Sequence, residues 1–276
     1  LAFNIQPVQM ELPKENQVEP AGGWQLLNWV GTFRALVIPA EFTNITHQTS
    51  NLTIHDRMFG PTGSVRSYYQ EISYNNFVLE GDTLGWVTLP HDSSYYGWDG
   101  FWVENHPALI LDAVAEADTH YTVNWPIYNF TVVVYSGHPD FNNISWTKWQ
   151  FGGGVPFPIS TRNFGSLSMR VCGLSEFLIS SWSDFNCPLG AYAHEFGHAL
   201  GLPDLYDYNA PNLANDTFVG RWDLMSMGCW NPSGPYASTY QELGTSPAHL
   251  SSYGKIKTGW IEPGWIAEVH PGSSDT

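Results

Sequence analysis

The sequence predicts an α+β fold with a cleft between two unequal lobes. Two apolar runs indicate buried strands, FRALVIPAEF at residues 33–42 and FTVVVY at residues 130–135. Helical patterns occupy residues 107–117 and 189–200, whereas residues 206–240 are rich in turn-forming side chains. Strands and helices followed by a mostly irregular second half are typical of α+β architecture.

The first half of the chain also contains shorter predicted elements. Residues 44–63 are polar and turn-rich, so we expect a loop there, and a short helix is expected at 65–73. Short strands are predicted at 77–79 and 86–89. Pro107 suits the first turn of the helix that follows it, because the N–H that proline lacks would have no partner there. One side of that helix is apolar, through Leu109, Leu111, Val114 and Ala115.

The second half contains two predicted helices separated by irregular segments. Residues 142–167 combine glycine, proline and aromatic side chains and are expected to be irregular. The helix at 189–200 should stop at Gly201-Leu202-Pro203, since glycine permits a sharp turn and proline cannot continue a helix. Pro247 opens a last predicted helix, which runs from Ala248 to about Lys257.

The charge balance argues against two classes of partner. The 276 residues contain 10 Lys+Arg against 26 Asp+Glu, which gives a formal net charge of −16. A protein that binds nucleic acids or anionic membranes needs clustered cationic side chains, so we expect neither as a partner. No run of 18 apolar residues occurs, so we expect no membrane span.

The chain starts at Leu1 without a basic and apolar leader, which fits a mature form and equally a cytosolic protein. Another feature favours a location outside the cell or on its surface. Five N-x-S/T sequons are candidate glycosylation sites, at Asn44, Asn51, Asn129, Asn143 and Asn215.

The three cysteines match neither a zinc ribbon nor a C-x-x-C redox site. Outside the cell, Cys172–Cys187 is the natural disulfide pair, and it would contribute roughly 3 kcal/mol in the chain-entropy description. The alternative is three buried reduced thiols. Cys229 is unexplained on either account.

The segment that carries chemistry is His194-Glu195-Phe196-Gly197-His198, an H-E-x-x-H motif. At 3.6 residues per turn, both histidines lie on one helical face, where their imidazoles can bind one zinc ion. Glu195 projects beside them and can act as the general base that takes a proton from a water activated by the metal.

The residues after this motif supply a candidate third ligand. Gly201 and Pro203 end the helix, so Asp204 approaches from another direction and completes H-E-x-x-H-x-x-G-x-x-D. Three protein ligands leave one coordination position open, as in catalytic rather than structural zinc sites. Asp207 is the competing candidate, but it needs a longer excursion and suits a role beside the ligands.

A methionine follows this motif by about 20 residues, at the spacing of a methionine turn. Met225 in WDLMSMG is favoured over Met227 for this turn, where it would form an apolar floor beneath the imidazoles. Taken alone, Met225 would be an ordinary core methionine.

Several segments resemble the catalytic domain of the immune-inhibitor-A-like metalloproteases. They are HEFGHALGLPDLYD, WDLMSMGCW, SPAHLSSYGKIKTGWI, LVIPAEF and SVRSYYQEISYNNFVLEG. The resemblance covers roughly residues 31–260. It implies a metzincin fold, in which a twisted mixed sheet with a backing helix and an active-site helix lies above the cleft. An irregular lower lobe with the methionine turn and a C-terminal helix would lie below.

The resemblance also implies domain limits and a function. Residues 1–30 would be an N-terminal extension, 31–201 the upper lobe with the active-site helix, and 202–276 the lower lobe. The expected function is that of a secreted zinc endopeptidase that acts on protein or peptide substrates. Such proteases are made as zymogens, so an inhibitory prosegment would be missing from this chain.

The sequence departs from the metzincin pattern in two ways. Asp204 stands where metzincins more often have histidine. Met227 stands where some carry a tyrosine that binds zinc or the oxyanion, which leaves Tyr236 and Tyr240 as weak alternatives.

Three other interpretations have less support in the sequence. A cell-surface glycoprotein with a structural or adhesive zinc site would need no base, yet Glu195 is present. A gluzincin would carry an N-E-x-x-S-D signature, which is absent. The acidic excess is compatible with bound calcium, but no D-x-D-x-D-G loop gives it a position.

Overall fold

A computed structural model describes six stretches of the chain. They are residues 27–96, 106–137, 157–178, 185–206, 219–234 and 242–262. These stretches form a mixed α+β structure, which confirms the predicted fold class at that level.

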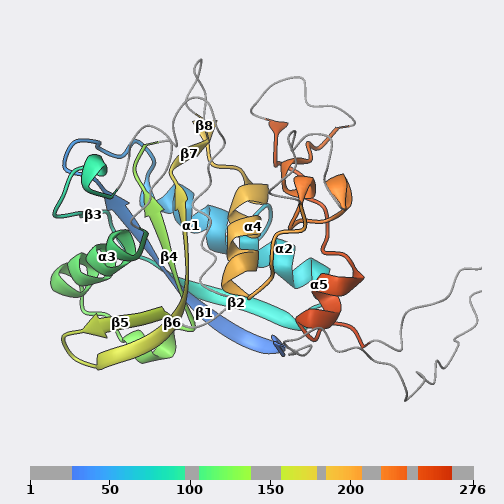
Figure 1. The fold of residues 1–276 in the computed structure, drawn as a ribbon, viewed down its shortest axis with the longest axis horizontal. Helices are drawn as coiled ribbons and strands as arrows, with labels where there is room; N and C mark the ends of the chain where they lie inside the picture. Colours follow the sequence, from blue (N-terminus) through green and yellow to red (C-terminus); the bar gives the residue numbers. More distant parts are fainter. Residues whose placement is uncertain are drawn as a thin grey trace, which may run out of the picture.

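A six-stranded mixed sheet forms the centre of the molecule (Figure 1). Its strands run in the order β2-β1-β4-β6-β5, and β3 pairs with the end of β1. All pairs are parallel except β5 with β6, which makes β5 an antiparallel edge. The strands are β1 Gly31–Glu41, β2 Phe77–Thr83, β3 Val87–Thr88, β4 Phe130–Tyr135, β5 Phe157–Thr161 and β6 Gly165–Ser175. A separate small hairpin pairs β7 Phe177–Leu178 with β8 Phe185–Asn186.

Helices cover both faces of the sheet, and α3 lies apart from the other helices in Figure 1. The described helices are α1 Asn51–Phe59, α2 Val65–Ile72, α3 His106–His120, α4 Leu189–Ala199 and α5 Ser252–Lys257. The short 3₁₀ turns are η1 Ser93–Tyr96, η2 Trp125–Ile127, η3 Gly220–Trp222 and η4 Met227–Trp230.

Successive side chains of the central strands point to opposite faces of the sheet. In β1, Ala35 and Val37 face the core shared with α1, α2 and α4, whereas Leu36 and Ile38 face the core under α3. Every residue of β4 is buried, as expected of a parallel strand covered on both sides. The apolar runs of the sequence therefore mark the middle of the sheet.

The predicted loop at 44–63 contains a helix, so that prediction is wrong. Ser50 caps α1 by accepting a hydrogen bond from the backbone N–H of Thr53. Ile54 and Met58, four residues apart, are buried and hold the helix against the core. The sequence shows this spacing, but the polar residues around it favour a loop by composition.

The irregular segment predicted at 142–167 contains the edge hairpin where the structure describes it. Phe157, Ile159 and Thr161 are buried and alternate with exposed residues, so β5 has the two-residue period of a strand. Residues 142–156 lie outside the described stretches. The helix predicted from residue 248 begins only at Ser252.

Residues 27–30 run beside the end of α5. Leu27 and Trp29 donate backbone hydrogen bonds to the carbonyls of Lys257 and Thr258, each at 2.8 Å. The indole of Trp29 donates to the carbonyl of Leu200 at 2.8 Å, at the end of α4. Within the described stretches, no helix is both long and apolar enough to cross a membrane.

Candidate metal centre

Helix α4 carries the H-E-x-x-H motif and is buried along its whole length. Two glycines allow its neighbours to approach closely. A Cβ added at Gly190 would stand 1.8 Å from the carbonyl oxygen of Cys229, and one at Gly197 would stand 2.5 Å from Sδ of Met225. The sequence therefore places small residues where the segment 223–230 packs on the helix.

The chain turns sharply after α4, as predicted. Gly201 has φ +92, in the left-handed region that favours glycine, and the N–H of Leu202 donates to the carbonyl of Gly197 at 3.0 Å. Leu205 then donates to the carbonyl of Met225 at 2.7 Å, which joins this turn to the segment beneath it. The turn brings Asp204 back to the two histidines.

Three potential ligand atoms converge at this point. Nε2 of His194 lies 3.0 Å from Oδ1 of Asp204, and Nε2 of His198 lies 3.3 Å from the same oxygen. One ligand atom from each of the three residues lies within 4.8 Å of the others. The side chain of Asp204 is fully buried.

Each imidazole is oriented by a hydrogen bond from its other nitrogen. Nδ1 of His194 donates to the carbonyl of Leu224 at 2.9 Å, and Nδ1 of His198 donates to the carbonyl of Leu202 at 2.8 Å. A carbonyl can only accept, so the hydrogen is fixed on Nδ1 and the Nε2 lone pair is directed at the cluster.

The cluster has the chemistry of a cation site. Nε2 of His198 is buried and makes no hydrogen bond, which suits a nitrogen that coordinates a metal. Burial alone would raise the pKa of Asp204, but the nearby His194 and His198 outweigh it and lower that pKa. Burial alone would lower the pKa of His194, yet its contacts with Asp204 and Cys229 raise it. A positive charge is therefore favoured between these side chains, and two imidazoles with one carboxylate fit zinc.

Glu195 on α4 and Met225 packed against that helix are also buried. Glu195 is 1% exposed and adjoins His194 on α4. Met225 is 1% exposed and lies against Gly197, whereas Met227 belongs to the following turn η4.

Sequence reasoning did not single out Tyr206. Burial and the nearby Asp204 carboxylate, to which its hydroxyl is hydrogen-bonded, raise the pKa of Tyr206. Its place two residues after the third candidate ligand is the signal that could have pointed to it.

The predicted disulfide is not formed in the structure, where Cys172, Cys187 and Cys229 are buried free thiols. Burial raises the pKa of each thiol, so the neutral form is favoured in the apolar core that contains all three. Cys229, which the sequence left unexplained, contacts the side chain of His194.

The remaining predicted positions are dispersed or not described. Asn44, Asn51 and Asn129 are exposed. Among the described residues, no second group of candidate metal ligands accompanies the one on α4, so calcium has no support. Five residues considered in the sequence lie outside the described stretches, namely Asn143, Asp207, Asn215, Tyr236 and Tyr240.

Comparison with known proteins gives matches to metalloproteases. Residues 180–261 match the catalytic domain of the immune inhibitor A peptidase M6 family. The pre-pro-metalloprotease PrtV of Vibrio cholerae is 24% identical over 229 residues, which are 71% of this chain and 24% of that protein. Immune inhibitor A of Bacillus thuringiensis is 23% identical over 224 residues, which are 69% of this chain and 31% of that protein. The chain thus spans less than a third of the length of these relatives.

With the ligand cluster, these matches support a metalloendopeptidase. More particularly, residues 180–261 are similar to the catalytic domain of the immune inhibitor A peptidase family, which confirms the resemblance found in the sequence.

Proposed function

We propose that this chain is a zinc-dependent endopeptidase in which His194, His198 and Asp204 hold the metal and Glu195 is the general base. The observation that carries the proposal is the convergence of the three ligand atoms within 4.8 Å of one another. Glu195 adjoins the first ligand on the same buried helix, and the comparisons with metalloproteases give independent support.

The proposed reaction is peptide-bond hydrolysis. Zinc, when bound, lowers the pKa of a water molecule toward neutrality and polarises the scissile carbonyl. The Glu195 carboxylate accepts the proton of the attacking water and passes it to the leaving amine. The hydrogen bonds on Nδ1 of both histidines would keep their Nε2 atoms free to hold the metal.

The finer structural assignment is also a proposal. A metzincin arrangement is supported by the mixed sheet, by α4 packed on it and by Met225 beneath Gly197. We place the upper lobe at residues 31–201 and the lower lobe at 202–276, after an extension at 1–30. Secretion, an extracellular setting and a zymogen stage are supported by the Vibrio relative, which is named as a pre-pro-metalloprotease.

The test is a casein-hydrolysis assay on the zinc-loaded chain, with and without a chelator. Chelation should abolish activity, and added zinc should restore it. Glu195→Ala should keep the fold and the metal but lose at least about 10²-fold in rate, the usual scale for removal of a general base. Full activity in that variant, or activity that survives chelation, would contradict the proposal. Zinc binding without hydrolysis would favour the structural or adhesive alternative.

A further inference from the structure

Asp223 is a buried carboxylate immediately before the turn that carries Met225. Its exposed fraction is 0%. Oδ1 accepts a hydrogen bond from the backbone N–H of Met225 at 2.6 Å, and Oδ2 accepts one from the backbone N–H of Ser251 at 2.7 Å. Its own carbonyl accepts from Ser226 and Gly228, both at 3.1 Å. One residue thus determines the course of the chain from 223 to 228.

The peptide between Asp223 and Met225 orients the first candidate ligand. The carbonyl of Leu224 accepts the Nδ1–H of His194 at 2.9 Å. The backbone N–H of Leu224 donates to the carbonyl of His249 at 3.3 Å. Asp223 and Met225 flank Leu224, and the Asp223 side chain is hydrogen-bonded to the N–H of Met225. The direction of the Leu224 carbonyl therefore depends on that side chain.

We propose that Asp223 is a positioning residue, which directs Nε2 of His194 at the metal by fixing the carbonyl of Leu224. The inference rests on the proposed function, because it concerns the same site. The chemistry requires a carboxylate, since both partners are backbone donors and aspartate offers two acceptors. Asparagine has one acceptor and one donor group, so one of the two N–H groups would face another donor.

The same carboxylate joins the metal centre to the segment that precedes α5. Ser251 is the residue before α5, and its side chain makes no capping hydrogen bond. Ala248 donates its N–H to the carbonyl of Gly228 at 3.0 Å, so residues 248–251 are engaged with the turn beneath α4. These contacts explain why α5 starts at Ser252 rather than at the predicted Ala248.

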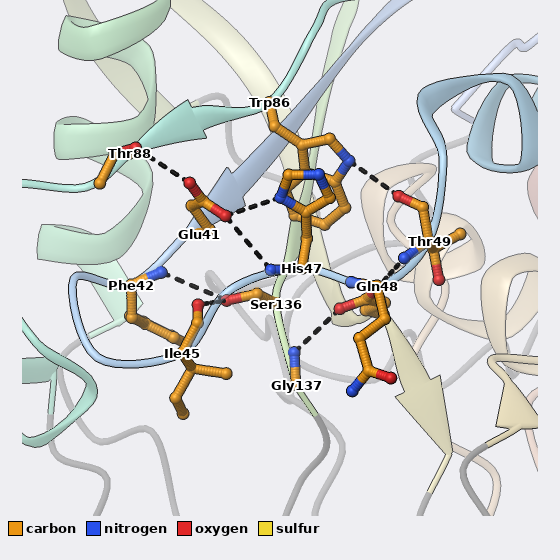
Figure 2. Close-up of polar contacts among 11 residues, drawn as sticks. Glu41, Phe42, Ile45, His47, Gln48, Thr49, Trp86, Thr88, Ser136 and Gly137 are labelled. Carbon is orange, nitrogen blue, oxygen red and sulfur yellow. Dashed lines mark hydrogen bonds and ion pairs between the residues drawn. The ribbon is translucent and has the colours of Figure 1, made fainter.

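Glu176 provides a matched control. It is 2% exposed, and like Asp223 it accepts hydrogen bonds from backbone N–H groups. Its donors are Gln48 at 2.5 Å, Thr49, and Gly137 at 3.1 Å, which lie together in Figure 2. None of these donors belongs to the turn that orients His194.

The experiment compares Asp223→Asn with Glu176→Gln in the full chain. Zinc affinity is measured by competition with a chromogenic chelator, and the visible spectrum of the Co²⁺-loaded protein reports coordination geometry. We expect Asp223→Asn to weaken zinc binding about 10-fold, the scale for groups that orient metal ligands, and to change the Co²⁺ spectrum. Glu176→Gln should leave both readouts unchanged. Equal zinc affinity in Asp223→Asn and the parent, or equal weakening in both variants, overturns the proposal.

A second pair of variants tests the bond from its other end, in case Asp223→Asn does not fold. Ser251 has φ −63, which proline can adopt, so Ser251→Pro removes the N–H donor while the charge at the site stays the same. Ser251→Ala keeps that N–H. Zinc binding should weaken in the proline variant alone, and equal affinity in both variants overturns the proposal. A parent chain that binds no zinc contradicts the proposed function itself, which separates that failure from this one.

Discussion

Two regions of this molecule are each built around a buried carboxylate that accepts backbone hydrogen bonds. Asp223 lies beneath α4, and Glu176 lies where β6 ends, beside the loop that follows β1 and the end of β4. The two differ in what their donors support. The donors to Asp223 belong to the turn that orients His194, whereas those to Glu176 hold loops at one edge of the sheet. What a buried carboxylate does for the candidate site therefore depends on which backbone segment it holds. Its burial alone does not show this.

The largest expected effect lies in the region of the candidate metal centre. Asp204→Ala should reduce zinc affinity by more than about 100-fold, beyond the range typical of groups that only orient ligands. The reason is that it removes a fully buried carboxylate between two imidazoles. Chelator competition measures the affinity. Asp204→His is the control and should retain zinc, because histidine is also a zinc ligand. Unchanged affinity in the alanine variant would exclude Asp204 as a ligand.

An intermediate effect is expected from Gly197→Ala. The new Cβ would stand 2.5 Å from Sδ of Met225 and 3.2 Å from the hydroxyl of Tyr69. Overpacking of this kind costs about 1–3 kcal/mol, partly offset by the better helix propensity of alanine. Urea denaturation of the zinc-free protein measures the loss. Adding Met225→Leu, which has a shorter side chain, should recover part of it; no recovery would mean that Met225 is not the obstacle.

The smallest effect is expected near Glu176, at Glu41. Glu41 accepts from Nδ1 of His47 at 2.6 Å and from Thr88 at 3.1 Å, and His47 stacks on Trp86 (Figure 2). Burial alone would raise the pKa of Glu41, but these hydrogen bonds outweigh it and lower the pKa from 4.5. A lowered folded-state pKa contributes stability above pH 4.5, and that stability is lost as pH falls through the folded pKa.

Glu41→Gln should therefore cost about 1 kcal/mol of unfolding free energy at pH 7. The difference from the parent should shrink as the pH falls below 4.5. Urea denaturation at a series of pH values gives this comparison, with Glu71→Gln as a control because the Glu71 side chain is 73% exposed. If the difference in unfolding free energy widened in acid, the lowered pKa of Glu41 would be contradicted. If Glu41→Gln changed the zinc affinity, the Glu176 region would not be separate from the candidate metal centre.

The sequence predicted the sheet centre better than its edges. The apolar runs that became β1 and β4 are buried on both faces, so their composition alone identifies them. The edge strand β5 buries only alternate residues and contains a proline, and it was assigned to an irregular segment. Helix α1 was missed because only three of its nine residues, Ile54, Met58 and Phe59, are buried.

The site was predictable where the motif is local. His194, Glu195 and His198 follow from helical spacing, and the structure brings Asp204 to the same histidines after a turn at Gly201. The carbonyl of Leu202, which orients His198, is local, but the groups that orient His194 depend on contacts between distant segments. No local pattern could indicate that Ser251 donates to Asp223, or that the carbonyl of Leu224 accepts from the first histidine.

The pairing of residues 27–30 with the end of α5 has a consequence for the order of folding. The indole of Trp260 donates to the carbonyl of Trp29 at 2.7 Å across a sequence separation of 231 residues. Closing a flexible loop of that length costs about 5 kcal/mol of chain entropy, so this contact should form late, after the sheet has shortened the effective loop. During synthesis, the hydrogen bond between Trp29 and Trp260 must wait until Trp260 has left the ribosome. The hydrogen bond from the Trp29 indole to the carbonyl of Leu200, at the end of α4, does not depend on that step. Leu200 is synthesised 60 residues before Trp260, so this bond can form earlier.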